Sequence, residues 1–258
     1  MFDFSSSMYR HLCRTLVECG YQSRQFRQYQ SMDLDAKDPF VIIRHDVDRY
    51  PQTAVQLAEI EHDLGLTATY FFRLVESAFE PAVIKRVAEL GMEIGYHYET
   101  LDRAKGDFAR AYELAKEDLT RLRQYGPVKS MAMHGNPLTS FDNRDLWKKY
   151  NYRDLGIDIA AYFTVDYSRI RYFTDTGRNW DSERGNLYDK VSAGAGINLR
   201  STIDLIRYLR ESPAHTCIST HPHRWTNRPA LWTYNLLYDR AGNVAKTFIR
   251  AMRGKRGV

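Results

Sequence analysis

Short apolar runs alternate with segments of helical spacing along most of this chain. The first run, Phe40 to Ile43, has four consecutive apolar residues, which is typical of a strand buried on both faces. Similar runs predict further strands at 67–72, 92–97, 129–134, 159–165, 170–174 and 216–220. Strands that alternate with helices form parallel sheets, and about seven such units favour a barrel over an open sheet.

The segments between these runs predict the helices. Apolar residues recur every three or four positions at 5–20, 54–64, 81–90, 106–124, 203–209 and 230–252, with a shorter helix around Leu146 and Trp147. Residues 21–38 are polar and are predicted to be irregular. We therefore expect an N-terminal helix and lead-in (1–38), a barrel (39–228) and a basic amphipathic C-terminal helix (229–258), the last either within the same domain or at a membrane surface.

The composition is ordinary for a globular protein: 258 residues, of which 43% are hydrophobic. The three cysteines (Cys13, Cys19 and Cys217) lack the spacing of a metal site, and their odd number argues against a disulfide framework. No apolar run approaches the ~20 residues of a membrane-spanning helix, and the first residues lack a signal-peptide pattern. We expect a cytoplasmic protein.

The net charge of +5 invites a nucleic-acid interpretation, but no nucleic-acid-binding signature accompanies it, and we predict no nucleic-acid partner. Much of the excess lies in the C-terminal segment, at Arg240, Lys246, Arg250, Arg253, Lys255 and Arg256. Such a balance suits an anionic substrate or membrane surface. The helix at 230–252 could lie peripherally on an anionic membrane or pack on the barrel, and the sequence leaves both open.

Polar residues suited to catalysis follow the predicted strands. The first strand ends in Arg44, His45, Asp46 and Asp48, which are costly to bury unpaired. One aspartate could merely cap the next helix, but a cap explains only one of the two. Five of the eight histidines fall at or just after strand ends: His45, His97, His134, His221 and His223. Parallel strands end at one rim, and histidine with aspartate suits Zn²⁺ or a similar divalent ion.

Four pieces of the chain, in order and spacing, resemble the polysaccharide deacetylase (carbohydrate esterase family 4) superfamily, in the branch whose first motif reads His-Asp-Val-Asp. They are Arg44-His-Asp-Val-Asp48, Glu93-Ile-Gly-Tyr-His97, Met133-His-Gly-Asn-Pro137 and Thr220-His-Pro-His-Arg-Trp225. The similarity covers most of residues 39–225. It implies an α/β fold, a distorted (β/α)7 barrel, that holds one divalent metal through an aspartate and two histidines.

The resemblance also implies catalytic roles. Asp46 resembles the general base and Asp48 the metal-binding aspartate; the exchanged assignment stays open, because Val47 separates two residues that are adjacent in the usual motif. His221 matches the late histidine that acts as general acid.

The remaining metal ligands follow from the second motif. His97 matches its first histidine, but Leu101 stands where the second histidine is expected. We therefore predict His134 as the replacement ligand, with Glu99 as the fallback. A further segment, Tyr172–Trp180, loosely resembles the family's fourth motif and contains Asp175 and Arg178. The residues predicted to bind substrate are Arg44, Glu99, Asn136, Asp175, Arg178, His223 and Trp225.

These features predict a metal-dependent hydrolase that removes an N-acetyl group from a sugar or a sugar-containing precursor in surface polysaccharide or lipopolysaccharide biosynthesis. The substrate would be nucleotide- or lipid-linked, and zinc is the first candidate metal, with cobalt, nickel or manganese as alternatives. Two other interpretations remain: a metal-dependent amidohydrolase or phosphoesterase, which His221-Pro-His223 would suit, and a non-catalytic barrel that lost its metal, which Leu101 would suit. The oligomeric state is left open.

Overall fold

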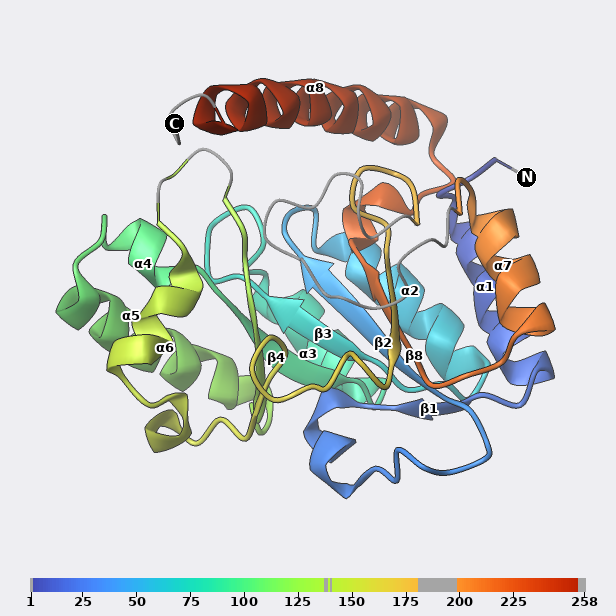
Figure 1. Cartoon of the computed structure of the whole chain (residues 1–258), viewed down its shortest axis with the longest axis horizontal. Coiled ribbons are helices and arrows are strands. Elements are labelled where there is room, and N and C mark those ends of the chain that lie inside the picture. The colour runs from blue at the N-terminus through green and yellow to red at the C-terminus, as the bar shows by residue number, and fades with distance from the viewer. Residues whose placement is uncertain (1, 137–138, 140, 181–198, 255–258) are drawn as a thin grey trace.

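The centre of the protein is a parallel sheet surrounded by helices. A computed structural model describes residues 2–136, 139, 141–180 and 199–254, with side chains up to Gly242 (Figure 1). The strands are β1 (Gln22–Arg24), β2 (Phe40–Val47), β3 (Thr69–Phe72), β4 (Glu93–Tyr98), β5 (Ser130–Met133), β6 (Ile159–Ala160), β7 (Arg171–Thr174) and β8 (Thr216–Thr220). Their order is β6-β5-β4-β3-β2-β8-β7, and every pairing is parallel.

This topology confirms the predicted fold class of seven parallel strands with intervening helices. In the described part of the chain, the edge strands β6 and β7 do not pair with each other, so the barrel is open on that side. The expected strands all occur, although 159–165 shortens to β6 because the chain turns back: the Phe163 and Thr164 amides donate to the Ala160 carbonyl.

The helices pack against one face of the sheet and at its ends. They are α1 (Ser6–Glu18), α2 (Gln52–Asp63), α3 (Pro81–Glu89), α4 (Thr100–Arg103), α5 (Phe108–Leu122), α6 (Leu146–Lys149), α7 (Thr202–Glu211) and α8 (Pro229–Gly254). Short 3₁₀ turns are η1 (Phe26–Ser31), η2 (Arg123–Tyr125), η3 (Asn143–Asp145), η4 (Tyr152–Leu155) and η5 (Pro222–Arg224). In Figure 1, α1 and α7 lie side by side at one end and α4, α5 and α6 at the other.

The central strand β2 is buried at all eight positions, as its apolar start predicts. It pairs with β8 on one side, while β1 and β3 share the other side: β1 pairs with Phe40–Ile42 and β3 with Arg44–Val47. The sequence predicted no strand in 21–38, so β1 is a difference from expectation. Its three residues are too few, and too polar, to give a periodic signal.

Helix α8 runs across the carboxyl-end side of the molecule, at the top of Figure 1. Trp232 Nε1 donates to the Asp3 carbonyl at 2.8 Å, and the Asp239 carboxylate accepts from Arg178 and Arg224. The first part of the helix therefore packs on the rest of the protein. None of the helices in the described ranges combines the length and apolarity needed to cross a bilayer.

Candidate active site

The carboxyl ends of five of the parallel strands carry the polar residues that the sequence singled out. Because all strands are parallel, these ends share one rim. The residues brought there are Asp46 and Asp48 from β2 and its following turn, His97 from β4, His134 after β5, Asp175 after β7 and His221 after β8.

Alternation along β2 decides which side chains face this rim. Arg44, Asp46 and Asp48 are two residues apart, so they share one side, and His45 points to the other. His45 Nε2 lies 2.6 Å from Glu61 Oε1, and its Nδ1 lies 2.6 Å from Thr220 Oγ1, both fully buried. The prediction that His45 joins the rim with the other histidines is wrong, because the pleat turns it away from them.

Asp48, His97 and His134 form a compact cluster of potential metal ligands, with one ligand atom from each lying within 4.8 Å of the others. Asp48 Oδ1 lies 3.1 Å from His134 Nδ1 and 3.4 Å from His97 Nε2. Burial alone would raise the pKa of Asp48, but the neighbouring His134 and His97 hold it well below its usual range. Asp48 is therefore ionised at neutral pH, as a ligand must be.

The surroundings of these residues fit a bound divalent cation. His97 Nδ1 donates to the Ala132 carbonyl at 3.1 Å, which leaves the Nε2 lone pair facing Asp48. Asp48 Oδ1 is buried and accepts no hydrogen bond in the described structure, an arrangement that a cation would satisfy. Leu101 instead packs with Ala111 and Leu146 in a small apolar cluster.

Asp46 lies beside this cluster and is held by an arginine on its own strand. Arg44 Nε and Nη2 each donate to one Asp46 oxygen at 2.8 Å, and Nη2 also donates to the Tyr162 hydroxyl at 2.9 Å. Asp46 Oδ2 is 3.7 Å from His97 Nε2. Burial would raise the pKa of Asp46, but Arg44 and His97 lower it below the usual carboxyl value. Asp46 is thus an ionised carboxylate of fixed orientation.

His221 and Asp175 form a second polar unit on the opposite side of Asp48. His221 Nδ1 lies 2.6 Å from Asp175 Oδ1, and the His221 amide donates to Oδ2 at 2.9 Å. The Asp175 carboxylate also accepts from Arg224 Nη1 at 2.8 Å and Trp225 Nε1 at 2.9 Å. Burial would raise the pKa of Asp175, but Arg224 and His221 hold it far below its usual range. His221 Nε2 consequently faces the site, 3.8 Å from Asp48 Oδ2.

Several residues predicted to bind substrate also have partners within the protein. Arg44 is fully buried against Asp46, and Trp225 is fully buried against Asp175. Arg178 Nε donates to Asp239 at 2.9 Å beneath Trp232. Each of these contacts neutralises a buried carboxylate or completes its hydrogen bonds, and the substrate contacts of these residues stay predictions.

Three other residues predicted to bind substrate, Glu99, His223 and Asn136, have different surroundings. Glu99 accepts two hydrogen bonds from Arg73, at 2.9 and 2.7 Å, and lies outside the metal-ligand cluster. His223 is buried, and burial followed by the Arg224 charge lowers its pKa well below the usual value, so it stays neutral. Asn136 is half-buried just after His134 and remains a predicted substrate contact.

Two residues that contact the site, Arg73 and Tyr162, were not predicted from the sequence. Arg73 directly follows β3 and donates from Nη1 to the Asp48 carbonyl at 3.2 Å, so it supports the turn that carries this ligand. The sequence could have indicated Arg73, because it is a polar residue that directly follows an apolar run, like the other residues at strand ends. Tyr162 reaches Arg44 from the turn after β6, 118 residues away, and no local pattern marks that contact.

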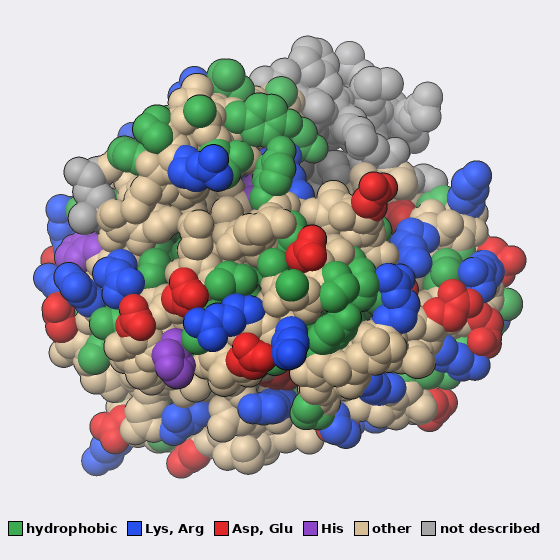
Figure 2. All heavy atoms as spheres, turned by 180° about the vertical axis from the view of Figure 1, so that it is seen from behind, with side chains coloured by type: hydrophobic (Ala, Val, Ile, Leu, Met, Phe, Trp, Pro, Cys, Tyr) green, Lys and Arg blue, Asp and Glu red, His purple; other side chains and the backbone are tan. Residues whose placement is uncertain are grey.

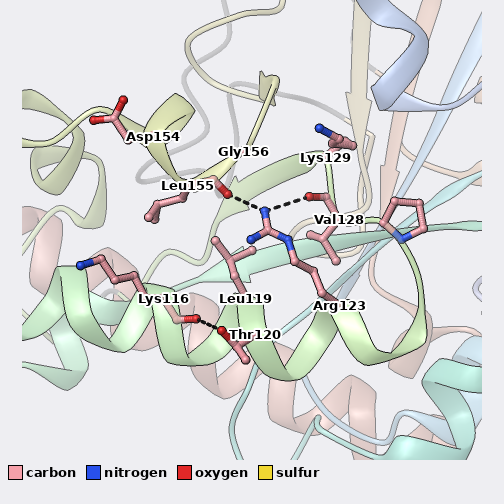
Figure 3. A pocket seen from close by; sticks show the side chains of 10 residues that line it. Lys116, Leu119, Thr120, Arg123, Val128, Lys129, Asp154, Leu155 and Gly156 are labelled. Carbon is pink, nitrogen blue, oxygen red and sulfur yellow. Dashed lines mark hydrogen bonds between the residues drawn. The ribbon is translucent and has the colours of Figure 1, made fainter.

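A separate pocket lies at the opposite end of the sheet, near the start of β5 (Figure 3). Its volume is about 580 Å³, and its lining includes Lys116, Lys129 and Asp154. Arg123 crosses it and donates to the carbonyls of Leu155 and Val128. It shares no residue with the rim and plays no part in the site.

No protein-family profile and no curated protein matches this chain. Among solved structures, it is similar to a family 4 carbohydrate esterase from Streptomyces lividans in complex with acetate: 16% identity, 80% of this chain and 90% of that chain covered, TM-score 0.42. It is also similar to a mutant of the peptidoglycan deacetylase PdaC from Bacillus subtilis: 12% identity, 85% and 99% covered, TM-score 0.36. Both TM-scores are below 0.5, so the function is inferred from the side chains of the site.

Proposed function

We propose that this protein is a metal-dependent hydrolase that removes the N-acetyl group from a sugar, or from a nucleotide- or lipid-linked sugar precursor, in surface polysaccharide or lipopolysaccharide biosynthesis. One observation carries the proposal: Asp48 stands between two histidines on one side and the His221–Asp175 pair on the other, with Asp46 alongside. A cytoplasmic location belongs to the proposal and is tested by cell fractionation.

Amide hydrolysis sets three requirements. An acetamide is a poor electrophile, so water must be activated, negative charge on the carbonyl oxygen must be stabilised, and the leaving amine must receive a proton. A divalent metal held by Asp48, His97 and His134 would polarise the carbonyl and lower the pKa of bound water from ~15.7 to about 7. Two nitrogens and one carboxylate oxygen suit zinc first, with cobalt, nickel or manganese as alternatives.

The remaining requirements fall to two other groups of this chain. Asp46 is ionised and oriented by Arg44, so it can take the proton of the attacking water. His221 presents Nε2 to the same space, while Asp175 holds Nδ1 and stabilises the imidazolium form. His221 can therefore deliver the proton to the leaving amine.

The test measures acetate release from N-acetylglucosamine oligomers and from a nucleoside-diphosphate-linked N-acetylglucosamine, together with metal content. Asp46→Asn should keep the metal and lose about 10²–10⁴-fold in turnover. Asp48→Asn should lose the metal. The reverse pattern would exchange the roles of the two aspartates.

Two results would contradict the proposal itself. Phosphate release from phosphate esters, without acetate release from acetamides, would favour a phosphoesterase. A protein that binds no metal after supplementation would favour a non-catalytic barrel.

A further inference from the structure

An aromatic and cationic surface adjoins the candidate active site. Arg49 and Tyr50 directly follow the candidate ligand Asp48, and they face the first turns of α8. Tyr50, Tyr234 and Tyr238 have 39%, 50% and 55% of their surface exposed. The Tyr234 and Tyr238 rings are one helical turn apart, with centroids 6.3 Å from each other. Figure 2 shows hydrophobic side chains gathered at the top of the molecule.

The charge of Arg49 is not neutralised by the rest of the described chain. Its guanidinium carbon lies 3.7 Å from the centre of the Tyr238 ring, and Nη2 donates to Asn235 Oδ1 at 3.4 Å. Its Nε is buried without a hydrogen-bond partner, and within the described ranges no carboxylate lies at ion-pair distance. A guanidinium charge without a carboxylate partner is one that a bound anion would neutralise.

The other arginines near this rim differ from Arg49, because each of them pairs with a carboxylate. They are Arg44 with Asp46, Arg73 with Glu99, Arg178 with Asp239 and Arg224 with Asp175. A structural role in neutralising a buried acid therefore explains those four and leaves Arg49 unexplained.

The position of Arg49 is fixed before any ligand binds. Tyr238 stacks on its guanidinium, and the next residue, Asp239, ties α8 to Arg178 and Arg224. Asn235, which contacts Arg49, also donates to the carbonyl of His223. An arginine held in this way loses little side-chain entropy on binding, so it is preorganised for a planar, two-pronged contact with an anion.

We propose that Arg49 binds a phosphate group carried by the substrate, next to the sugar that enters the site, and that Tyr50, Tyr234 and Tyr238 pack against the group attached to that phosphate. The inference rests on the proposed function for the position of the sugar. The fork of the guanidinium matches phosphate oxygens, and tyrosine faces pack equally on a nucleobase or on an apolar chain. The substrate class is then an N-acetylated sugar joined to phosphate.

The test measures binding by calorimetry to the full chain as purified. The probes are glucosamine 1-phosphate and glucosamine, which carry no acetyl group, so binding is read without turnover. The phosphorylated sugar should bind at least about tenfold more tightly, and this preference should shrink as salt increases. Arg49→Gln should abolish the preference, while Arg49→Lys should keep part of it. Arg110→Gln, at an exposed arginine of α5, is the matched control and should keep all of it.

Equal affinity for the two sugars in the wild type, or a preference that survives Arg49→Gln, would overturn the proposal. Because the binding probes carry no acetyl group, a protein that releases no acetate could still show this preference for the phosphorylated sugar. The deacetylase proposal and the phosphate-binding proposal can therefore fail independently.

Two further probes identify the group beyond the phosphate: a nucleoside-diphosphate-linked glucosamine and a short-chain prenyl-diphosphate-linked glucosamine. The probe that binds more tightly than glucosamine 1-phosphate shows whether the group attached to the phosphate is a nucleoside or a prenyl chain. Tyr234→Ala should remove that gain and Tyr234→Phe should keep it. A gain for neither probe would overturn the role of the three tyrosines.

Discussion

The Nδ1 atom of His221 lies 2.6 Å from Oδ1 of Asp175, across the ends of the paired strands β8 and β7. The His221 amide donates to the other oxygen of the same carboxylate, so backbone and side chain are fixed together. This contact sets the proton on Nδ1 and leaves Nε2 as the ring atom available to the site. Asp175 is thus a positioning residue for His221.

Asp175→Asn should therefore impair turnover without removing the metal. The amide nitrogen can place a donor against Nδ1, which favours the wrong tautomer, and the charge that stabilises the imidazolium is lost. We expect kcat to fall by about 10²–10⁴-fold at full metal content, from acetate-release rates and metal analysis. Asp239→Asn is the comparison, since it removes the other carboxylate partner of Arg224 without touching His221. A similar loss of kcat in both variants would assign the effect to Arg224 and the fold.

His97→Ala should release most of the bound metal. His97 is almost fully buried, and Ala132 already holds its Nδ1, so no neighbouring side chain can substitute for Nε2 without a backbone shift. Metal content after dialysis measures the effect, and His62→Ala, at an exposed histidine of α2, should keep full stoichiometry. Unchanged metal in His97→Ala would exclude the cluster as the binding site.

Much of the fold was predictable because its strands are short apolar runs bounded by polar residues. Thr216–Thr220 lies where the sequence predicts it, and the strand predicted at Phe40–Ile43 continues to Val47. Strand β1 was not predictable, because its pairing with β2 comes from the neighbouring strand and not from its own residues. The packing of α8 was left open for the same reason: Asp239 contacts Arg178, 61 residues earlier.

The site was predictable to the extent that strand ends carry it. Asp48, His97 and His134 come together because β2, β4 and β5 are parallel and close in the sheet. Side-chain direction was partly readable, since alternation along β2 separates His45 from Asp46. What a local pattern cannot give is the partner of a charged residue. Arg178 resembles a substrate contact in sequence, and only the fold shows that its charge is taken by a carboxylate.

The Arg44–Asp46 pair should behave as one energetic unit. Arg44→Met leaves a buried carboxylate without its guanidinium, which should lower the free energy of unfolding by about 3–5 kcal/mol. Adding Asp46→Asn removes the uncompensated charge and should restore part of that loss. A double-mutant cycle by urea denaturation measures the coupling. Additivity within about 0.5 kcal/mol would show that the two residues do not interact in solution.

Glu93 should make stability depend on pH. It is buried at the start of β4, where Ser130, Thr69 and the Arg27 amide donate to it. Burial outweighs these donors and raises its pKa above the usual value of about 4.3. A raised folded-state pKa adds stability below the unfolded value and loses it as pH rises through the folded one.

Glu93→Gln removes this titration. Relative to the wild type, the variant should gain stability as pH rises above about 4.3, until the wild-type carboxyl is fully ionised. Urea denaturation across this range measures the difference, and the exposed Glu89→Gln should show no such trend. A difference that is constant with pH would mean that Glu93 has an unshifted pKa.

Two truncations of the C-terminal segment should differ in their effect on the unfolding temperature. A chain that ends at Arg228 loses Trp232, Asn235 and Asp239, whose contacts hold Asp3, His223 and Arg224, so it should unfold at a markedly lower temperature. A chain that ends at Gly242 keeps these contacts and lacks five basic residues, namely Lys246, Arg250, Arg253, Lys255 and Arg256. It should unfold near the wild-type temperature.

The chain that ends at Gly242 tests the membrane prediction, because it lacks most of the C-terminal basic residues. Each basic residue near an anionic surface contributes ~1 kcal/mol to binding, and salt weakens that attraction. The wild type should sediment with vesicles that contain phosphatidylglycerol and release as salt increases, whereas the chain that ends at Gly242 should remain in the supernatant. Vesicles of phosphatidylcholine alone are the control and should bind neither protein. Equal sedimentation of both proteins with the anionic vesicles would show that residues 243–258 do not direct membrane contact.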